Sequence, residues 1–149
     1  MHIRPLVPAD IEQARLDDLF LAELPKTPPW ATATLGSFYR FAEWLLANRG
    51  PQVVLLVADD GGPQLAGIYA GVEIQLPYYD SGTLLNDQFF AAVRPGAMQA
   101  LLQAVRHEAR LRGCNALTMG CMSTRPEVTA RWGRRLGLQP LTLTLFEEV

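Results

Sequence analysis

One short segment, residues 88–109, constrains the fold more than any other part of the chain. Its first six residues read Gln-Phe-Phe-Ala-Ala-Val, which is typical of a β-strand, and Arg-Pro-Gly follows without a spacer. Beyond Gly96 the apolar residues recur at helical spacing, so the sequence predicts a strand, a very tight turn and a helix in immediate succession. The first amides of a helix lack partners within it and the helix dipole favours anions, so this junction is a candidate phosphate site.

The chain is long enough for one domain with one hydrophobic core. Of its 149 residues 49% are hydrophobic, and roughly two thirds of the unfolded surface of such a chain can be buried. No repeat or linker interrupts it, so we expect a single domain over residues 1–149. Two cysteines without CxxC spacing favour a reduced protein, and with only two histidines a His/Cys metal cluster is not expected, which leaves a carboxylate-only site as the alternative. Without a signal-like start or a long apolar run, we expect a cytoplasmic protein that does not enter a membrane.

Charge is distributed unevenly along the sequence. Residues 1–93 carry five basic side chains against eleven acidic ones, a balance of −6, whereas residues 94–135 carry eight arginines against two glutamates, a balance of +6. Such asymmetry can mark an anion-binding half, although arginines lining the solvated face of one or two helices are the commoner cause. The overall net charge of −2 and the absence of a nucleic-acid motif argue against nucleic acid as a partner.

Periodicity and turn residues predict alternating strands and helices. We expect strands at residues 1–6, 52–58, 65–76, 84–93, 117–122 and 141–146. We expect one helix from Asp10, as its N-cap residue, through Phe20, and others at residues 35–48, between Pro95 and Gly113, and at 128–136. The alternation within residues 65–76 places the polar side chains of that strand on one face.

The order β-α-α-β-β-β-α-β-α-β resembles that of the GCN5-related N-acetyltransferase superfamily over nearly the whole chain. Ile3-Arg4-Pro5 followed by Asp10 is similar to the family's first strand and helix, and Leu136-Gly137-Leu138 is similar to the Leu-Gly-Phe that ends its last helix. The resemblance implies an α/β fold with a mixed, mostly antiparallel central sheet flanked by helices and splayed between the fourth and fifth strands. A different mixed α+β domain with the same local order is the alternative.

The resemblance also implies a site for acetyl-CoA, the acetyl donor of the family. In the family the pantetheine arm pairs with free backbone groups of the splayed fourth strand, and the pyrophosphate sits on amides at the start of the next helix. The positions that match are Ala91 and Val93 for the thioester, Arg94, Gly96, Ala97 and Met98 for the pyrophosphate, and Arg131 and Arg134 for further phosphate contacts. The family's usual loop, Arg/Gln-x-x-Gly-x-Gly/Ala, is shortened here to Gly-Ala-Met-Gln-Ala between Pro95 and Leu101, which predicts weaker donor binding or none.

Acyl transfer to an amine also needs groups that accept and return a proton. Glu73 is the first candidate for the base because it lies mid-strand on the polar face, and Asp87 on the next strand is the second; either can instead be an ordinary hydrogen-bonded carboxylate. The family's usual acid is a tyrosine four residues before the glycine of Leu-Gly-Phe, and Gly133 occupies that position here. Tyr78 and Tyr79 could supply the acid from the hairpin, or serve as packing or contact residues.

Two functions remain open from the sequence. The first is acetyl transfer from acetyl-CoA to an amine on a small molecule or a protein, without a metal. The second is a non-catalytic interaction module that uses the same cleft, or the aromatic residues Trp30, Tyr78 and Tyr79, to bind another protein. Exposure of those aromatic side chains favours the module, and donor binding favours the enzyme. Sheet edges and the Tyr78-Tyr79 hairpin are compatible with a homodimer.

Overall fold

A single curled sheet organises the molecule. The structure is a computed structural model that describes residues 1–120 and 126–140. The sheet contains β1 (His2–Pro5), β2 (Val53–Asp59), β3 (Gly67–Gln75), β4 (Thr83–Ala92) and β5 (Ala116–Leu117), in that spatial order. The first four strands are antiparallel to their neighbours, and β5 runs parallel to β4, which confirms the mixed sheet expected from the sequence. The expected strand at 141–146, and the end of the one at 117–122, lie outside the described residues.

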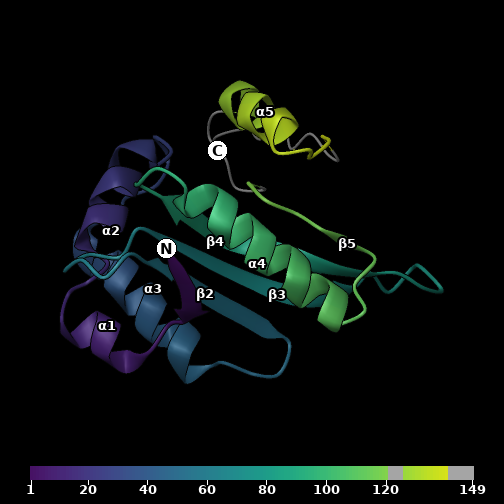
Figure 1. The fold of residues 1–149 in the computed structure, drawn as a ribbon, viewed down its shortest axis with the longest axis horizontal. Helices are drawn as coiled ribbons and strands as arrows, with labels where there is room; N and C mark the ends of the chain where they lie inside the picture. Colours follow the sequence, from purple (N-terminus) through teal and green to yellow (C-terminus); the bar gives the residue numbers. More distant parts are fainter. Residues whose placement is uncertain (121–125, 141–149) are drawn as a thin grey trace.

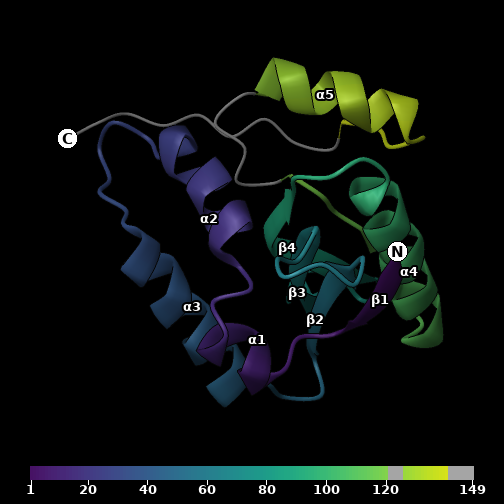
Figure 2. The same cartoon turned by 60° about the vertical axis from the view of Figure 1, so that its left-hand side comes forward.

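Helices cover both faces of this sheet (Figures 1 and 2). On one face lie α1 (Pro8–Glu12), α2 (Asp17–Glu23) and α3 (Leu35–Ala47), and a short 3₁₀ turn (Leu24–Lys26) follows α2. The other face is covered by α4 (Ala97–Leu111). The last helix, α5 (Pro126–Arg135), packs near β4 and α4. Side chains of β3 alternate between the two faces, so Ile68 and Ala70 enter the core beneath α2 and α3 whereas Tyr69 packs under α4. No helix within residues 1–120 and 126–140 has the length and apolar character needed to cross a bilayer.

A cluster of four charges fastens the first helix to the sheet. Val7, not Asp10, is the N-cap residue of α1; the expectation for Asp10 was wrong because its carboxylate reaches back from the third helical position to the Val7 N–H, 3.1 Å away. Asp10 also accepts hydrogen bonds from Arg4 at 2.8 Å and from Arg15 at 3.1 Å. Asp59 on β2 binds the same two arginines. We call these four side chains the Asp10 network.

Burial and hydrogen bonding act in opposite directions on the acids of this network. Burial alone raises the pKa of Asp10, whose side chain is only 2% exposed, but hydrogen bonds from Arg4 and the Val7 N–H, with the charges of Arg4 and Arg15, leave the pKa below its ordinary value. Hydrogen bonds from Arg15 hold the pKa of Asp59 well below its usual range. Both acids are therefore held in the ionised form by folding.

The single helix expected from Asp10 through Phe20 is broken into α1 and α2. Ala14 adopts a left-handed conformation with φ of +52°, which L-residues other than glycine rarely take. The break turns Arg15 back toward Asp10 and Asp59, while Leu16 and Phe20 still enter the core. The requirement to pair Arg15 thus overrides the helical periodicity.

β4 contains one residue more than β3 can oppose. Ala70 pairs with Phe89 and the next residue, Gly71, pairs with Asp87, so Gln88 is the extra residue of a β-bulge. The extra residue reverses the alternation of faces, since Leu85 before it and Phe90 after it both belong to the core under α4. This bulge determines what β4 presents at the candidate site.

Candidate functional site

In the part of the chain that the structure describes, β4 and β5 pair over two residues and then separate. Leu84 and Leu85 lie opposite Ala116 and Leu117, and the Thr118 N–H donates to the Leu85 carbonyl oxygen at 2.9 Å. Within the described residues the strand pairing stops there. This is the splay between the fourth and fifth strands that the sequence resemblance implied, and we call it the β4–β5 opening.

The side chain of Asp87 bridges the two strands where the opening begins. Its carboxylate accepts hydrogen bonds from the Gly120 N–H at 2.7 Å and from the Thr118 hydroxyl at 2.8 Å. The same hydroxyl accepts a hydrogen bond from the Asp87 N–H at 3.1 Å. Because Asp87 is only 3% exposed, these bonds form away from solvent and set the spacing between the strands.

We expect Asp87→Asn to lower the free energy of unfolding by about 2 kcal/mol, because the NH2 group that replaces one carboxylate oxygen cannot accept from the donor it faces, and the other donor loses its charged partner. Urea denaturation measures this loss. The exposed hairpin carboxylate offers a matched control, Asp80→Asn, which we expect to leave the midpoint nearly unchanged. Unchanged stability combined with lost turnover would instead assign Asp87 to catalysis.

The bulge selects the backbone groups of β4 that face the β4–β5 opening. The Val93 N–H donates to the Ala66 carbonyl oxygen at 3.0 Å, on the β3 side. Because backbone groups alternate along a strand, the Ala91 N–H points the same way, and those of Phe90 and Ala92 face the opening. The expectation that the amides of Ala91 and Val93 face the donor is therefore wrong, because Gln88 shifts the alternation by one residue.

The start of α4 offers fewer free amides than its sequence suggests. Gly96 is the N-cap residue with φ of +81°, and no atom lies within 4 Å of where a Cβ would stand. Ala97 is buried and its N–H donates to the Arg94 carbonyl oxygen at 3.2 Å, which closes the turn. Met98 and the exposed Gln99 complete the first turn, where amides have no partner within a helix. These two amides and the helix dipole remain for an anion.

Arg94 points away from that helix start. Its guanidinium lies 2.5 Å from the Asp60 carboxylate and 3.7 Å from that of Asp18. The hydrogen bond to Asp60 raises the pKa of Arg94, and that carboxyl group's own pKa is lowered in turn. A phosphate must displace both carboxylates to engage Arg94, so in this conformation the arginine stabilises the turn between β2 and β3.

α5 packs against the opening and carries the other two candidate arginines. The Trp132 ring lies 6.1 Å, between centroids, from the ring of Phe90. Gly120 permits close packing of α5, since a Cβ there would come within 2.6 Å of the Thr129 side chain. Arg131 and Arg134 are exposed on this helix. Phe90 and Trp132 were not expected at this site from the sequence, because β4 and α5 meet only in the folded chain.

The two candidate carboxylates lie on the same face of the sheet. Glu73 lies opposite Leu85 and Asp87 lies opposite Gly71, so the two acids are diagonal neighbours with Cα atoms about 7–8 Å apart. The Glu73 carboxylate lies 3.5 Å from the guanidinium of Arg112 near the end of α4. The structure therefore brings Glu73 and Asp87 together, but it also gives Glu73 a cationic partner.

The hairpin tyrosines are remote from this opening. Tyr78 and Tyr79 are 73% and 57% exposed, and their ring centroids lie 4.8 Å apart. About 14 Å of strand separates Thr83, where β4 begins, from Asp87. Neither tyrosine is therefore placed to act as an acid at the opening. Residues 1–120 and 126–140 contain no group of three or more His, Cys, Asp or Glu side chains suited to a metal ion.

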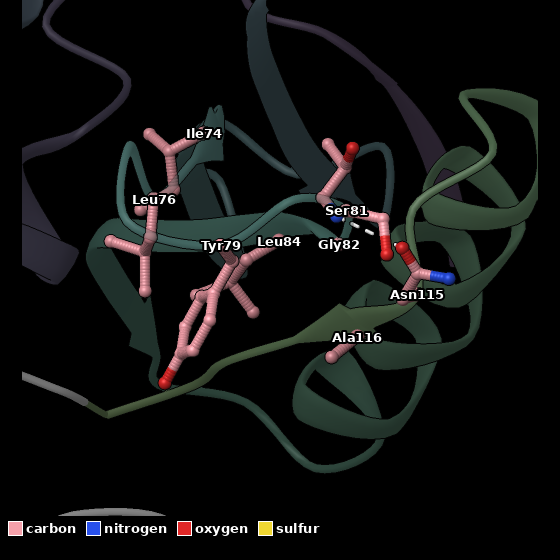
Figure 3. Close-up of a pocket in the computed structure, with 9 residues that line it drawn as sticks. Ile74, Leu76, Tyr79, Ser81, Gly82, Leu84, Asn115 and Ala116 are labelled. Atoms are coloured by element: carbon pink, nitrogen blue, oxygen red, sulfur yellow. Dashed lines mark hydrogen bonds between the residues drawn. The ribbon is translucent and has the colours of Figure 1, made fainter.

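A cavity of about 330 Å³ opens at the hairpin end of the sheet (Figure 3). Its apolar lining comes chiefly from Ile74, Leu76, Leu84 and the ring of Tyr79. Beside it, the Thr83 N–H donates to the Asn115 side-chain oxygen at 2.9 Å, and the Asn115 N–H donates to the Thr83 carbonyl oxygen at 2.8 Å. These reciprocal bonds hold the start of β4 to the start of β5.

Known proteins share this architecture. No protein-family model matches the chain, and no curated protein matches it. Among solved structures, the aminoglycoside N-acetyltransferase AAC(6')-Iy matches with a TM-score of 0.69 and 16% identity, over 99% of this chain and 97% of that one. Glucosamine-6-phosphate N-acetyltransferase from Arabidopsis thaliana matches with 0.67 and 14%, over 99% and 97%. A transcriptional regulator from Bacillus halodurans matches with 0.67 and 18%, over 99% of each chain. At these identities the matches show the fold, and they confirm the one that the sequence implied.

Proposed function

We propose, from its GCN5-related N-acetyltransferase fold and its β4–β5 opening, that this chain transfers an acetyl group from acetyl-CoA to an amine. The observation that carries the proposal is the separation of β4 from β5 after Leu85, which leaves backbone groups of Phe90 and Ala92 facing the opening beside the start of α4. The pantetheine arm of CoA pairs with such groups in this fold. The structures of AAC(6')-Iy contain CoA or a CoA-linked bisubstrate analogue.

The residues of this chain suit the pantetheine arm of the donor better than its phosphates. Backbone groups of Phe90 and Ala92 would hold the pantetheine arm, and the path would continue past Ala91, Val93 and Gly96. The amides of Met98 and Gln99, aligned with the helix dipole, would hold the pyrophosphate. The further phosphate contacts would come from Arg131 and Arg134 on α5, and from Arg94 once it leaves Asp60. With two free amides in place of a glycine-rich loop, we expect weak donor binding.

The chemistry requires little beyond positioning and proton transfer. The amine nitrogen attacks the thioester carbonyl carbon, a C–N bond forms, the C–S bond breaks, the nitrogen loses a proton and the thiolate gains one. Glu73 is the proposed acceptor of the amine proton, through a water molecule that enters the β4–β5 opening from the α4 face. Asp87 is the second choice because its carboxylate is already occupied by Gly120 and Thr118.

Titration with acetyl-CoA tests the donor site, and two single-charge variants on α4 sharpen the test. Gln99→Glu places a negative charge in the first helical turn, where it stabilises the helix but repels a pyrophosphate. We expect the affinity for CoA to fall by roughly three- to tenfold while thermal stability is kept or increased. Gln103→Glu, an exposed position one turn later, adds the same charge and should have a smaller effect. Calorimetry measures the affinity, and a thermal melt measures the stability.

Two results would overturn this assignment. One is the absence of binding heat with millimolar acetyl-CoA for the unaltered protein. The other is an equal loss of affinity in Gln99→Glu and Gln103→Glu, which would place the phosphates away from the start of α4.

The exposed aromatic side chains favour a second candidate, a non-catalytic interaction module. Trp30, Tyr78 and Tyr79 are 54%, 73% and 57% exposed, and large exposed aromatic groups commonly mark protein-binding surfaces. The turn before α4 also uses the Ala97 amide internally and pairs Arg94 with carboxylates. This candidate replaces the enzyme if acetyl-CoA does not bind.

A further inference from the structure

We propose that the cavity at the hairpin end of the sheet binds the apolar body of the amine acceptor, so that the acceptor is a long alkyl or arylalkyl amine. We call the residues lining this cavity the hairpin pocket. The inference rests on the proposed function, because the amine must receive its acetyl group at the β4–β5 opening. It is carried by the position, lining and charge of the pocket.

The hairpin pocket and the β4 bulge share one face of the sheet. Ile74 pairs with Leu84, and Ala70 pairs with Phe89 just beyond the bulge. Ala70 and Ile74 are an even number of residues apart on a strand without a bulge, so all four side chains lie on the α2 and α3 side. The distance along β3 from Ala70 to Ile74 is about 13 Å. An extended molecule lying on this face therefore reaches both the pocket and the β4–β5 opening.

An aromatic surface begins where that molecule would meet the opening. The ring of Phe89 lies 5.9 Å from that of Phe41 and 5.8 Å from that of Phe38, between centroids. These three rings are only partly buried, although they pack against the main core. The path from the opening toward the pocket thus starts on aromatic carbon, which suits an apolar or aromatic chain.

The hairpin pocket itself lacks charge. None of its nine lining residues is Asp, Glu, Lys or Arg, and its volume of about 330 Å³ lies at the lower end of the range for small-molecule sites. The polar side-chain groups of the lining are uncharged and come from Tyr79, Ser81, Thr83 and Asn115. Glu73, the nearest acid on β3, projects to the α4 face toward Arg112, so it lies outside the pocket and can meet the amine only where the acceptor enters the β4–β5 opening between the two faces. A polycationic acceptor finds no complementary charge in this pocket, whereas an apolar chain matches it.

Adjacent tyrosines provide a matched test. Tyr79 lines the pocket and Tyr78 does not, and both are exposed, so each can be replaced by alanine with little effect on the fold. The probes are octylamine, phenylbutylamine and, as a polycationic comparison, kanamycin. Binding is measured by calorimetry without acetyl-CoA, and acetylation is then measured with it. In the reaction the amine nitrogen forms the C–N bond, the C–S bond of the thioester breaks, and the thiolate receives a proton.

We expect octylamine and phenylbutylamine to bind and to be acetylated in preference to kanamycin. Tyr79→Ala should weaken their binding about five- to tenfold, and Tyr78→Ala less than twofold. Equal effects of the two variants, or a preference for kanamycin, would overturn the inference about the hairpin pocket. If acetyl-CoA still binds in that case, the proposed function is retained. Binding of the apolar amines without any binding of acetyl-CoA would keep the pocket assignment and overturn the proposed function.

Discussion

Replacing Glu73 with glutamine is expected to lower kcat by about 100-fold while leaving the affinity for acetyl-CoA nearly unchanged. The substitution removes a proton acceptor and keeps the side-chain volume, and a general base typically contributes about 10²–10⁴-fold. The expected loss is at the lower end of this range because the Glu73 side chain is 29% exposed and forms an ion pair with Arg112. Steady-state acetylation with a bound apolar amine, together with calorimetry for the donor, measures both quantities.

Arg112 makes this experiment diagnostic. Arg112→Gln removes the ionic partner of Glu73 but leaves the carboxylate, so it should lower kcat much less than Glu73→Gln does. Equal losses of kcat in the two variants would show that the reaction depends on the ion pair between Glu73 and Arg112, and that Glu73 is not the general base. A loss below about threefold in Glu73→Gln would assign this carboxylate to structure, and Asp87→Asn would then be the remaining test of a base on the central strands.

The largest expected effect on stability comes from the Asp10 network. Asp10→Ala should lower the free energy of unfolding by about 3 kcal/mol, because it leaves Arg4 and Arg15 partly buried with Asp59 as their one shared acid. For a domain of this size the melting temperature should fall by about 6–12 °C. Glu12→Ala removes an exposed carboxylate from the same helix and should change stability by less than about 0.5 kcal/mol.

Acid titration gives an independent measure of the same network. Folding lowers the pKa values of Asp10 and Asp59, so their contribution is complete above the unfolded-state value of about 3.9 and is lost as the pH falls below it. The unaltered protein should therefore lose stability steeply below about pH 4. Asp10→Ala should show a shallower loss, and identical slopes for the two proteins would contradict the role given to this side chain.

The strand order and the layers followed from the sequence because hydrophobic periodicity and turn residues act locally. The run before Arg94, the turn at Gly96 and the helix beyond it all formed where those signals predicted. The direction of the Arg94 side chain did not follow, since Asp60 and Asp18 meet it only after β2, β3 and α2 have packed. Charged side chains in folded proteins are placed by partners distant in sequence, which local patterns do not reveal.

The same reason explains the errors at α1 and β4. Helical periodicity from Ile11 to Phe20 gave no sign that Arg15 would be drawn to Asp59, 44 residues away. The alternation of β4 gave no sign that Gln88 would be left without an opposing residue on β3. A bulge depends on the register between two strands, so the backbone groups at the β4–β5 opening could be assigned only from the folded chain.

The bulge at Gln88 also constrains how this sequence can change in length. Deleting one residue there would move each side chain from Phe89 to Ala92 to the other face of the sheet. Phe89 would then point toward α4, and Phe90 toward α3. The aromatic surface and the contact with Trp132 would exchange sides together. Removing two residues preserves the alternation but shortens β4. Related chains that keep this arrangement should therefore differ in length in the hairpin before Thr83, and not within the strand.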